Sequence, residues 1–202
     1  MDQMVKAIWT SDYNNSSAVE KLLKLVQYLS RLLNRSKKRN SLRLLYNNLS
    51  ITRRTLRLFK QINVMVSIIK LVKHNKITGK NIFRLSYLIL LFIFLNLDGV
   101  ILACKIGYIK DQRFISKLFT VVDFLWIAQN ALSLIDHSIA LSDITEDDSD
   151  ADRKVFHIHH DMVKRVADTG SALCFYFSTF GELFLSLNGI FSAFLGLSLN
   201  RG

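Results

Sequence analysis

A twenty-residue apolar segment, residues 85–104, constrains the fold of this chain more than any other feature. Its sequence, LSYLILLFIFLNLDGVILAC, contains one charged residue, Asp98. A helix of about 20 apolar residues is long enough to cross the hydrocarbon core of a bilayer. We therefore predict a transmembrane helix over residues 85–104, with Lys105 and Lys110 following it.

Two further apolar segments occur later in the chain. Residues 118–135 contain one charge, Asp123, and could span a membrane, lie in its interface, or pack as a core helix. Residues 183–200 contain no charge, and we expect them to form a second transmembrane helix. The small residues Gly189, Ala193 and Gly196 share one face of that helix. Because small residues let another helix approach closely, we predict a packing surface there, within the chain or between chains.

Charge is unevenly distributed along the 202 residues. Residues 1–80 hold 17 Lys and Arg but 3 Asp and Glu, whereas residues 81–202 hold 10 and 13. Proline is absent, which favours long uninterrupted helices. We therefore divide the chain into a basic helical region, 1–80, which we expect to face the cytosol, and a membrane region, 81–202.

Two amphipathic helices are predicted in the basic region. Residues 18–35 place leucine and valine at helical spacing, with basic residues on the other side. The stretch before them, residues 1–17, is expected to be irregular. A second helix is predicted from about residue 41 to about residue 72. The stretch 73–80 that follows is expected to end it, with Gly79 as the terminating residue.

The pattern of these two helices is typical of helices that lie on an anionic membrane. The predicted membrane-inserting residues are Leu49, Leu56, Phe59, Ile62 and Val66. The predicted contacts with lipid phosphates are Lys21, Lys24, Arg31, Arg53, Arg54, Arg57 and Lys60. Packing of these helices against other helices remains an alternative. A nucleic-acid binder would not combine such wide aliphatic faces with near-spanning segments, so we expect no nucleic-acid partner.

No motif for catalysis, cofactor binding or metal binding is present in a convincing form. His157 and His160 share a helical face, but Asp161 is the one further ligand nearby, so we predict solvated histidines and no metal. Residues 142–154 form a predicted acidic loop, without the glycine and closing glutamate of a calcium loop. Ser149 within it is a possible phosphorylation site.

Three carboxylates suggest an alternative function. Ionisable groups in membrane segments are costly and usually paired or functional. Asp98, Asp123 and Glu182 could therefore serve a small-solute channel or transporter. Asp98, next to Gly99, could mark a break in its helix or pair with Lys105. A soluble helical bundle with a basic binding face is a third possibility.

The order of these features resembles the peroxin-eleven family of peroxisomal membrane proteins. The stretches that carry the resemblance are VEKLLKLVQYLSRLL (19–33), SLRLLYNNLSITRRTLRLFKQI (41–62), YLILLFIFLNLDGVILACKIGYI (87–109), and the later VKRVADTGSALCF and LNGIFSAFLGL. Each motif is degenerate, and the specificity lies in their collinear order.

The resemblance implies a peroxisomal or glycosomal membrane protein that elongates membranes before organelle division, without catalysis. It implies insertion of an amphipathic segment, here residues 41–72, into the cytosolic leaflet. It also implies self-association and cooperation with a dynamin-related GTPase and fission adaptors. The predicted fold is all-α, with basic amphipathic helices followed by about two transmembrane helices.

Overall fold

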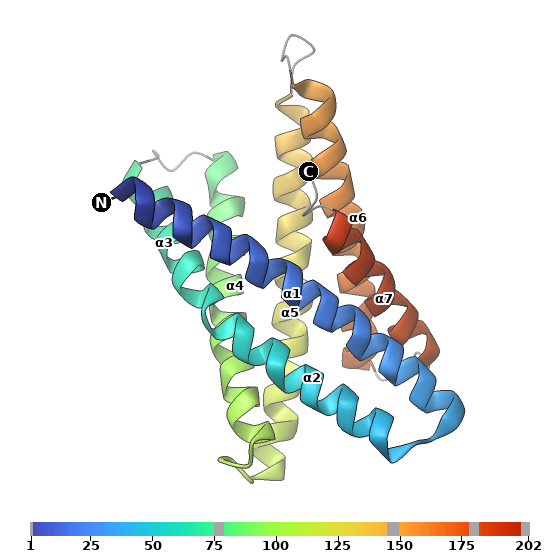
Figure 1. Ribbon diagram of the computed structural model, residues 1–202. Helices are drawn as coiled ribbons and strands as arrows, with labels where there is room; N and C mark the ends of the chain where they lie inside the picture. Colours follow the sequence, from blue (N-terminus) through green and yellow to red (C-terminus); the bar gives the residue numbers. More distant parts are fainter. Residues whose placement is uncertain (1, 75–78, 145–149, 178–181, 199–202) are drawn as a thin grey trace.

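All regular structure in the described part of the chain is α-helical, which confirms the predicted fold class (Figure 1). The computed structural model describes residues 2–74, 79–144, 150–177 and 182–198. The helices are α1 (Asp2–Lys37), α2 (Asn40–Leu58), α3 (Lys60–His74), α4 (Gly79–Lys105), α5 (Gln112–Ser142), α6 (Ala151–Phe177) and α7 (Glu182–Ser198).

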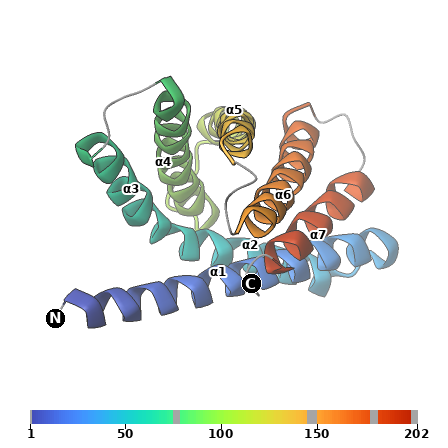
Figure 2. The ribbon, with the colours of Figure 1, turned by 90° about the horizontal axis from the view of Figure 1, so that it is seen from above.

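The first two helices form a hairpin that lies across one side of the other helices (Figure 2). Behind this hairpin, α4 packs on α5, α5 on α6, and α6 on α7. The hairpin joins both ends of this series, because α2 packs on α4 and α1 packs on α7. The helices therefore surround a shared interior, although their segments lie far apart in sequence.

Two helix boundaries differ from the predictions. The first helix begins at Asp2 rather than near residue 18. Residues 2–17 contain neither proline nor glycine, so no strong helix breaker separates them from the amphipathic segment. The predicted helix over 41–72 is divided at Phe59 into α2 and α3. The division follows the packing, because α2 contacts both α1 and α4 while α3 packs against α4.

The turn between α4 and α5 is specified by two residues. Gly107 adopts a φ of 88°, in the left-handed region that glycine enters without steric cost. Asp111 then caps α5, since its side chain accepts a hydrogen bond of 2.9 Å from the backbone N–H of Arg113. The two most apolar long helices are thereby held as an antiparallel pair.

In the described part of the chain, α4 and α5 are the helices long and apolar enough to cross a membrane. The matching segments are Asn81–Lys105 and Gln112–Ser142, and just 22% and 28% of their most apolar windows are buried inside the fold. The predicted span over 85–104 therefore corresponds to α4. The second span was predicted over 183–200, but α7 has 17 residues and is the shorter apolar helix. The longer α5 meets the length requirement instead.

Candidate functional site

The outer surface of the first three helices is rich in large apolar side chains. Phe59 is 68% exposed, Ile62 53% and Val66 41%, whereas Leu49 and Leu56 are half-buried. Further exposed apolar residues on these helices are Val19, Leu22, Val26, Leu29, Leu33, Leu44, Leu45, Leu58, Met65, Ile69 and Val72. We call the exposed residues from Val19 to Val72 the outer apolar face. Large exposed apolar surfaces are typical of sites that contact a membrane, a protein or a ligand.

The predicted lipid-contacting arginines point the other way, into the interior. The Arg53 side chain is 8% exposed, Arg54 18% and Arg57 23%. Lys60 is 25% exposed, and it lies in the same cluster. The expectation of basic side chains on the outside of this helical segment therefore does not match their placement. Their binding of lipid phosphates stays a prediction.

Glu20 is the centre of one group of these cations. Its carboxylate accepts a hydrogen bond of 2.7 Å from Arg57 Nε and is also paired with Lys60, while Arg53 Nη2 lies 3.9 Å away. Burial alone would raise the pKa of Glu20, but Arg57, Lys60 and Arg53 together hold it well below its usual range. Glu20 is therefore ionised and binds α1 to the α2–α3 segment.

Asp98 is the centre of a second group and is 2% exposed. It is paired with Arg54, and Arg57 Nη1 lies 3.3 Å from its Oδ2. The pairing that was considered from the sequence, with Lys105, is not the one observed. Lys105 Nζ instead donates a hydrogen bond of 2.8 Å to Ser50 Oγ. A carboxylate on a membrane-length helix is thus neutralised by two arginines of α2.

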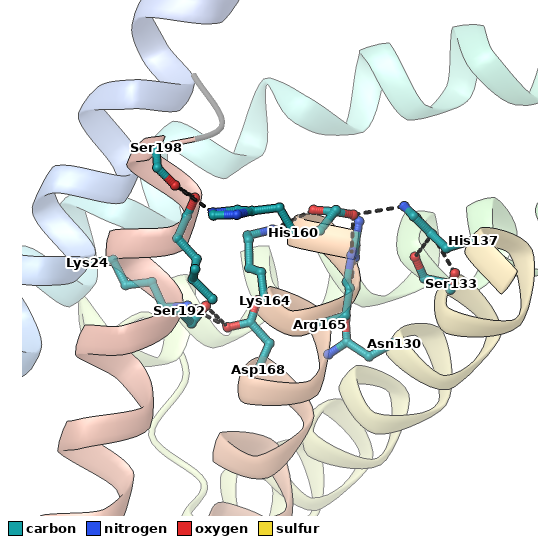
Figure 3. Close-up of polar contacts among 12 residues, drawn as sticks. Lys24, Asn130, Ser133, His137, His160, Lys164, Arg165, Asp168, Ser192 and Ser198 are labelled. Carbon is teal, nitrogen blue, oxygen red and sulfur yellow. Dashed lines mark hydrogen bonds and ion pairs between the residues drawn. The ribbon is translucent and has the colours of Figure 1, made fainter. Parts of the chain in front are cut away.

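Lys24 and Asp168 connect α1 to α6 and α7 (Figure 3). Lys24 Nζ lies 2.6 Å from Asp168 Oδ1 and 2.7 Å from Ser192 Oγ, and Ser192 donates to the same carboxylate. Burial lowers the pKa of Lys24 to about 8, against the opposing effect of Asp168. Burial raises the pKa of Asp168 but Lys24 and Lys164 outweigh it, so that it falls to about 2.

The two remaining predicted lipid contacts are also held by neighbours within the fold. The Arg31 guanidinium lies 5.4 Å from the ring centres of Tyr46 and Phe175, a geometry suited to cation–π attraction. The methylene groups of Lys21 pack over Gly196. Arg31 therefore covers parts of α2 and α6, and Lys21 covers part of α7.

The small-residue face of α7 lies against α1. A Cβ at Gly189 would overlap the Tyr28 ring, and one at Gly196 would lie 3.1 Å from Lys21 Cδ. Ala193, between them, is 1% exposed. Tyr28 is itself buried and belongs to a cluster with Cys174 and Leu185. The face thus lies within the chain, where Gly189 leaves the space that the Tyr28 ring occupies.

A further ionic network between α5 and α6 was missed in the sequence analysis (Figure 3). Asp161 Oδ2 lies 3.0 Å from His137 Nε2 and 3.2 Å from Arg165 Nε. Arg165 also donates to the Tyr87 hydroxyl at 3.1 Å, which ties α4 to α6. The available signal was the i, i+4 spacing of Asp161 and Arg165.

Some predicted features fall outside what the structure describes. Ser149 lies in the undescribed residues 145–149, within the predicted acidic loop between α5 and α6. The side chain of Glu182 is likewise outside the described set. Among the described residues, no group of three or more His, Cys, Asp or Glu side chains is placed to hold a metal ion.

Comparison with protein families matches residues 7–199 to Peroxisomal biogenesis factor 11 (PEX11). The chain belongs to this family. The PEX11 match covers all of α2 to α7 and nearly all of α1, so the inward cations and the outer apolar face both lie inside it. No curated protein and no solved structure matches the chain significantly. Membership of the PEX11 family gives a role in peroxisome proliferation and division, at the peroxisomal membrane.

Proposed function

We propose that this PEX11 protein elongates the peroxisomal membrane by burying its outer apolar face in one leaflet. The observation that carries the proposal is the inversion of polarity along α1 to α3. Many of their large apolar side chains are exposed, whereas Lys24, Arg54, Arg57 and Lys60 are paired with carboxylates inside. Such a surface is favoured next to acyl chains and disfavoured in water.

The mechanism follows from the position of these helices on one side of the fold. The α1–α2 hairpin lies across one side of the other helices, and α4 and α5 are long enough to span the bilayer. Helices inserted into one leaflet enlarge that leaflet relative to the other, which favours curvature. We expect the inserted leaflet to be the cytosolic one.

The proposal is tested with the full chain reconstituted into vesicles containing anionic lipid. The double variant Ile62→Asp/Val66→Asp places two charges on the outer apolar face. We expect the native chain to draw vesicles into tubules under electron microscopy, and this variant to fail. The matched control, Asn47→Asp/Thr52→Asp, adds the same charge at exposed polar positions of α2 and should tubulate normally. Equal tubulation by both double variants would refute the mechanism.

The proposed function includes self-association and recruitment of partner proteins. The resemblance to the peroxin-eleven family implies self-association and recruitment of a dynamin-related GTPase with fission adaptors. Both follow naturally for a protein that prepares a tubule for scission without catalysis of its own.

The alternative, a small-solute channel, rests on Asp98 and Asp123. Both side chains line an interior cavity, although Asp98 is paired with arginines. Measuring solute flux across the membrane of vesicles that contain the Asp123→Asn variant separates the two functions. Flux that falls while tubulation persists would favour the channel.

A further inference from the structure

An interior cavity of about 290 Å³ lies between the α1–α2 hairpin and helices α4 to α7. This volume is close to the lower end of the range for small-molecule sites, about 300–1,000 Å³. One part of the wall is charged, and another is aromatic, with Phe94, Trp126 and Phe175 in consecutive ring contacts of 6.4 Å. A cavity with these two parts can hold a charged group and exclude water around it.

The lining carries more positive than negative charge. Eight cationic side chains face four carboxylates. The cations are Lys21, Lys24, Arg53, Arg54, Arg57, Lys60, Lys105 and Lys164, and the carboxylates are Glu20, Asp98, Asp123 and Asp168. A largely buried excess of positive charge favours the binding of an anion that compensates it.

Three of the four carboxylates have close cationic partners, and these do not include Lys105. Glu20 pairs with Arg57 and Lys60, and Asp168 pairs with Lys24. Asp98 pairs with Arg54 and Arg57. Lys105 Nζ donates a hydrogen bond to the uncharged Ser50 hydroxyl.

Arg53 has the same kind of environment as Lys105. It is 7% exposed, its shortest bond is 2.6 Å to the uncharged amide of Gln27, and Glu20 lies at 3.9 Å. The Nε atoms of Arg53 and Arg54 are buried without a hydrogen-bond partner among the described residues. Buried N–H groups are normally satisfied, so these two donors lack an acceptor.

Arg53, Arg54 and Lys105 all line this cavity, together with Ser50. Ser50, Arg53 and Arg54 lie within one turn of α2, at i, i+3 and i+4, so they share a helix face. Lys105 reaches this face from the end of α4 through its bond to Ser50. Two guanidinium groups and an ammonium group therefore lie together. The buried Nε donors of Arg53 and Arg54 lack an oxygen acceptor there.

We propose that this cavity binds a phosphate group through Arg53, Arg54 and Lys105. The planar guanidinium matches the spacing of phosphate oxygens, and lysine adds a compact positive charge. The phosphate could belong to a soluble compound or to a lipid head group, since both offer the same oxygens. This inference is independent of membrane elongation, because the cavity faces the interior and the outer apolar face does not contribute to it.

The test uses the full chain in a neutral detergent, with inorganic phosphate as the soluble probe. Thermal unfolding is followed in phosphate and in chloride at equal ionic strength, which removes general screening. We expect phosphate, and not chloride, to raise Tm in a saturable way. Lys105→Gln should weaken the apparent affinity at least tenfold, while the exposed Lys117→Gln should not change it. Arg53→Gln serves as a second cavity variant if it folds.

The lipid source is tested in parallel by native mass spectrometry with phosphatidic acid and phosphatidylcholine. Selective retention of phosphatidic acid that is lost in Lys105→Gln, without any response to inorganic phosphate, identifies a lipid head group. A response to inorganic phosphate identifies a soluble ligand. The proposal is overturned if neither probe binds, or if Lys105→Gln and Lys117→Gln behave alike.

Discussion

At the scale of single residues, the contact between Tyr28 and Gly189 fixes the approach of α1 to α7. Because a Cβ at this glycine would overlap the ring, Gly189→Ala forces the two helices apart. Overpacking of this kind costs about 1–3 kcal/mol. We therefore expect a clearly lower Tm for Gly189→Ala in detergent. Gly79→Ala is the control, since a Cβ there meets nothing within 4 Å. Equal Tm values for the two variants would contradict the packing described.

Asp168 makes a pH-dependent contribution to stability. Its pKa in the folded protein is about 2, and an unfolded aspartate has a pKa of about 4. The unfolded state binds more protons between these values, so the contribution is complete above about pH 4 and is lost as the pH falls toward 2. Tm measured from pH 6 to pH 2 should therefore fall less steeply for Asp168→Asn than for the native chain. Parallel curves would show that the Lys24 pair contributes nothing in this range.

At the scale of helices, the orientation of α2 and α3 is the feature that decides how the chain meets a membrane. Phe59, between them, is 68% exposed, whereas Trp126 lines the interior cavity. In vesicles with brominated acyl chains, a tryptophan at position 59 should be strongly quenched. The measurement compares two variants. The first carries Phe59→Trp together with Trp9→Phe and Trp126→Phe, so that position 59 holds its single tryptophan. The second carries Trp9→Phe alone, so that Trp126 is its single tryptophan and serves as the protected reference. Weaker quenching at position 59 than at Trp126 would place the outer apolar face away from the acyl chains.

The sequence predicted that α2 has one basic and one apolar face, and the structure agrees with the division of residues. It did not predict which face points inward. That choice depends on carboxylates distant along the chain, because Asp98 lies 41 residues beyond Arg57, and Asp168 lies 144 residues beyond Lys24. Helical periodicity reports residues within a few turns of each other, so it carries no information on such partners.

Helix lengths were predicted unevenly for a related reason. The apolar run of α4 coincides closely with the helix itself, so 85–104 was recognised. In α5, polar residues at both ends extend the helix to Gln112–Ser142, well beyond its apolar segment of 118–135. Ranking segments by uncharged length therefore favoured α7, whose helix is in fact shorter.

One clue in the sequence went unused: Glu20 is one of three acids among the first 80 residues, which suggests a specific partner for its carboxylate.

At the scale of the whole molecule, the distribution of polarity predicts firm membrane association. The helices α4 and α5, which are long and apolar enough to span a membrane, expose most of their apolar windows, and α1 to α3 add the outer apolar face. We therefore expect the chain to stay in the membrane fraction when peroxisomes are extracted with alkaline carbonate. A peripheral protein held by charge would be released by this treatment. Release of this chain would exclude the two spans and support a soluble helical bundle.

The pairing of Asp98 with Arg54 and Arg57 also constrains how the protein is made. A ribosome releases α2 before α4, so the counter-ions exist before the carboxylate that they neutralise. Until α4 docks, Arg54 lacks its carboxylate while the aliphatic surface of α2 is bare, a combination prone to aggregation in water. The docking of α4 therefore supplies the carboxylate that Arg54 lacks until then. The docking of α4 and the closing of the ionic interior are then one step of folding.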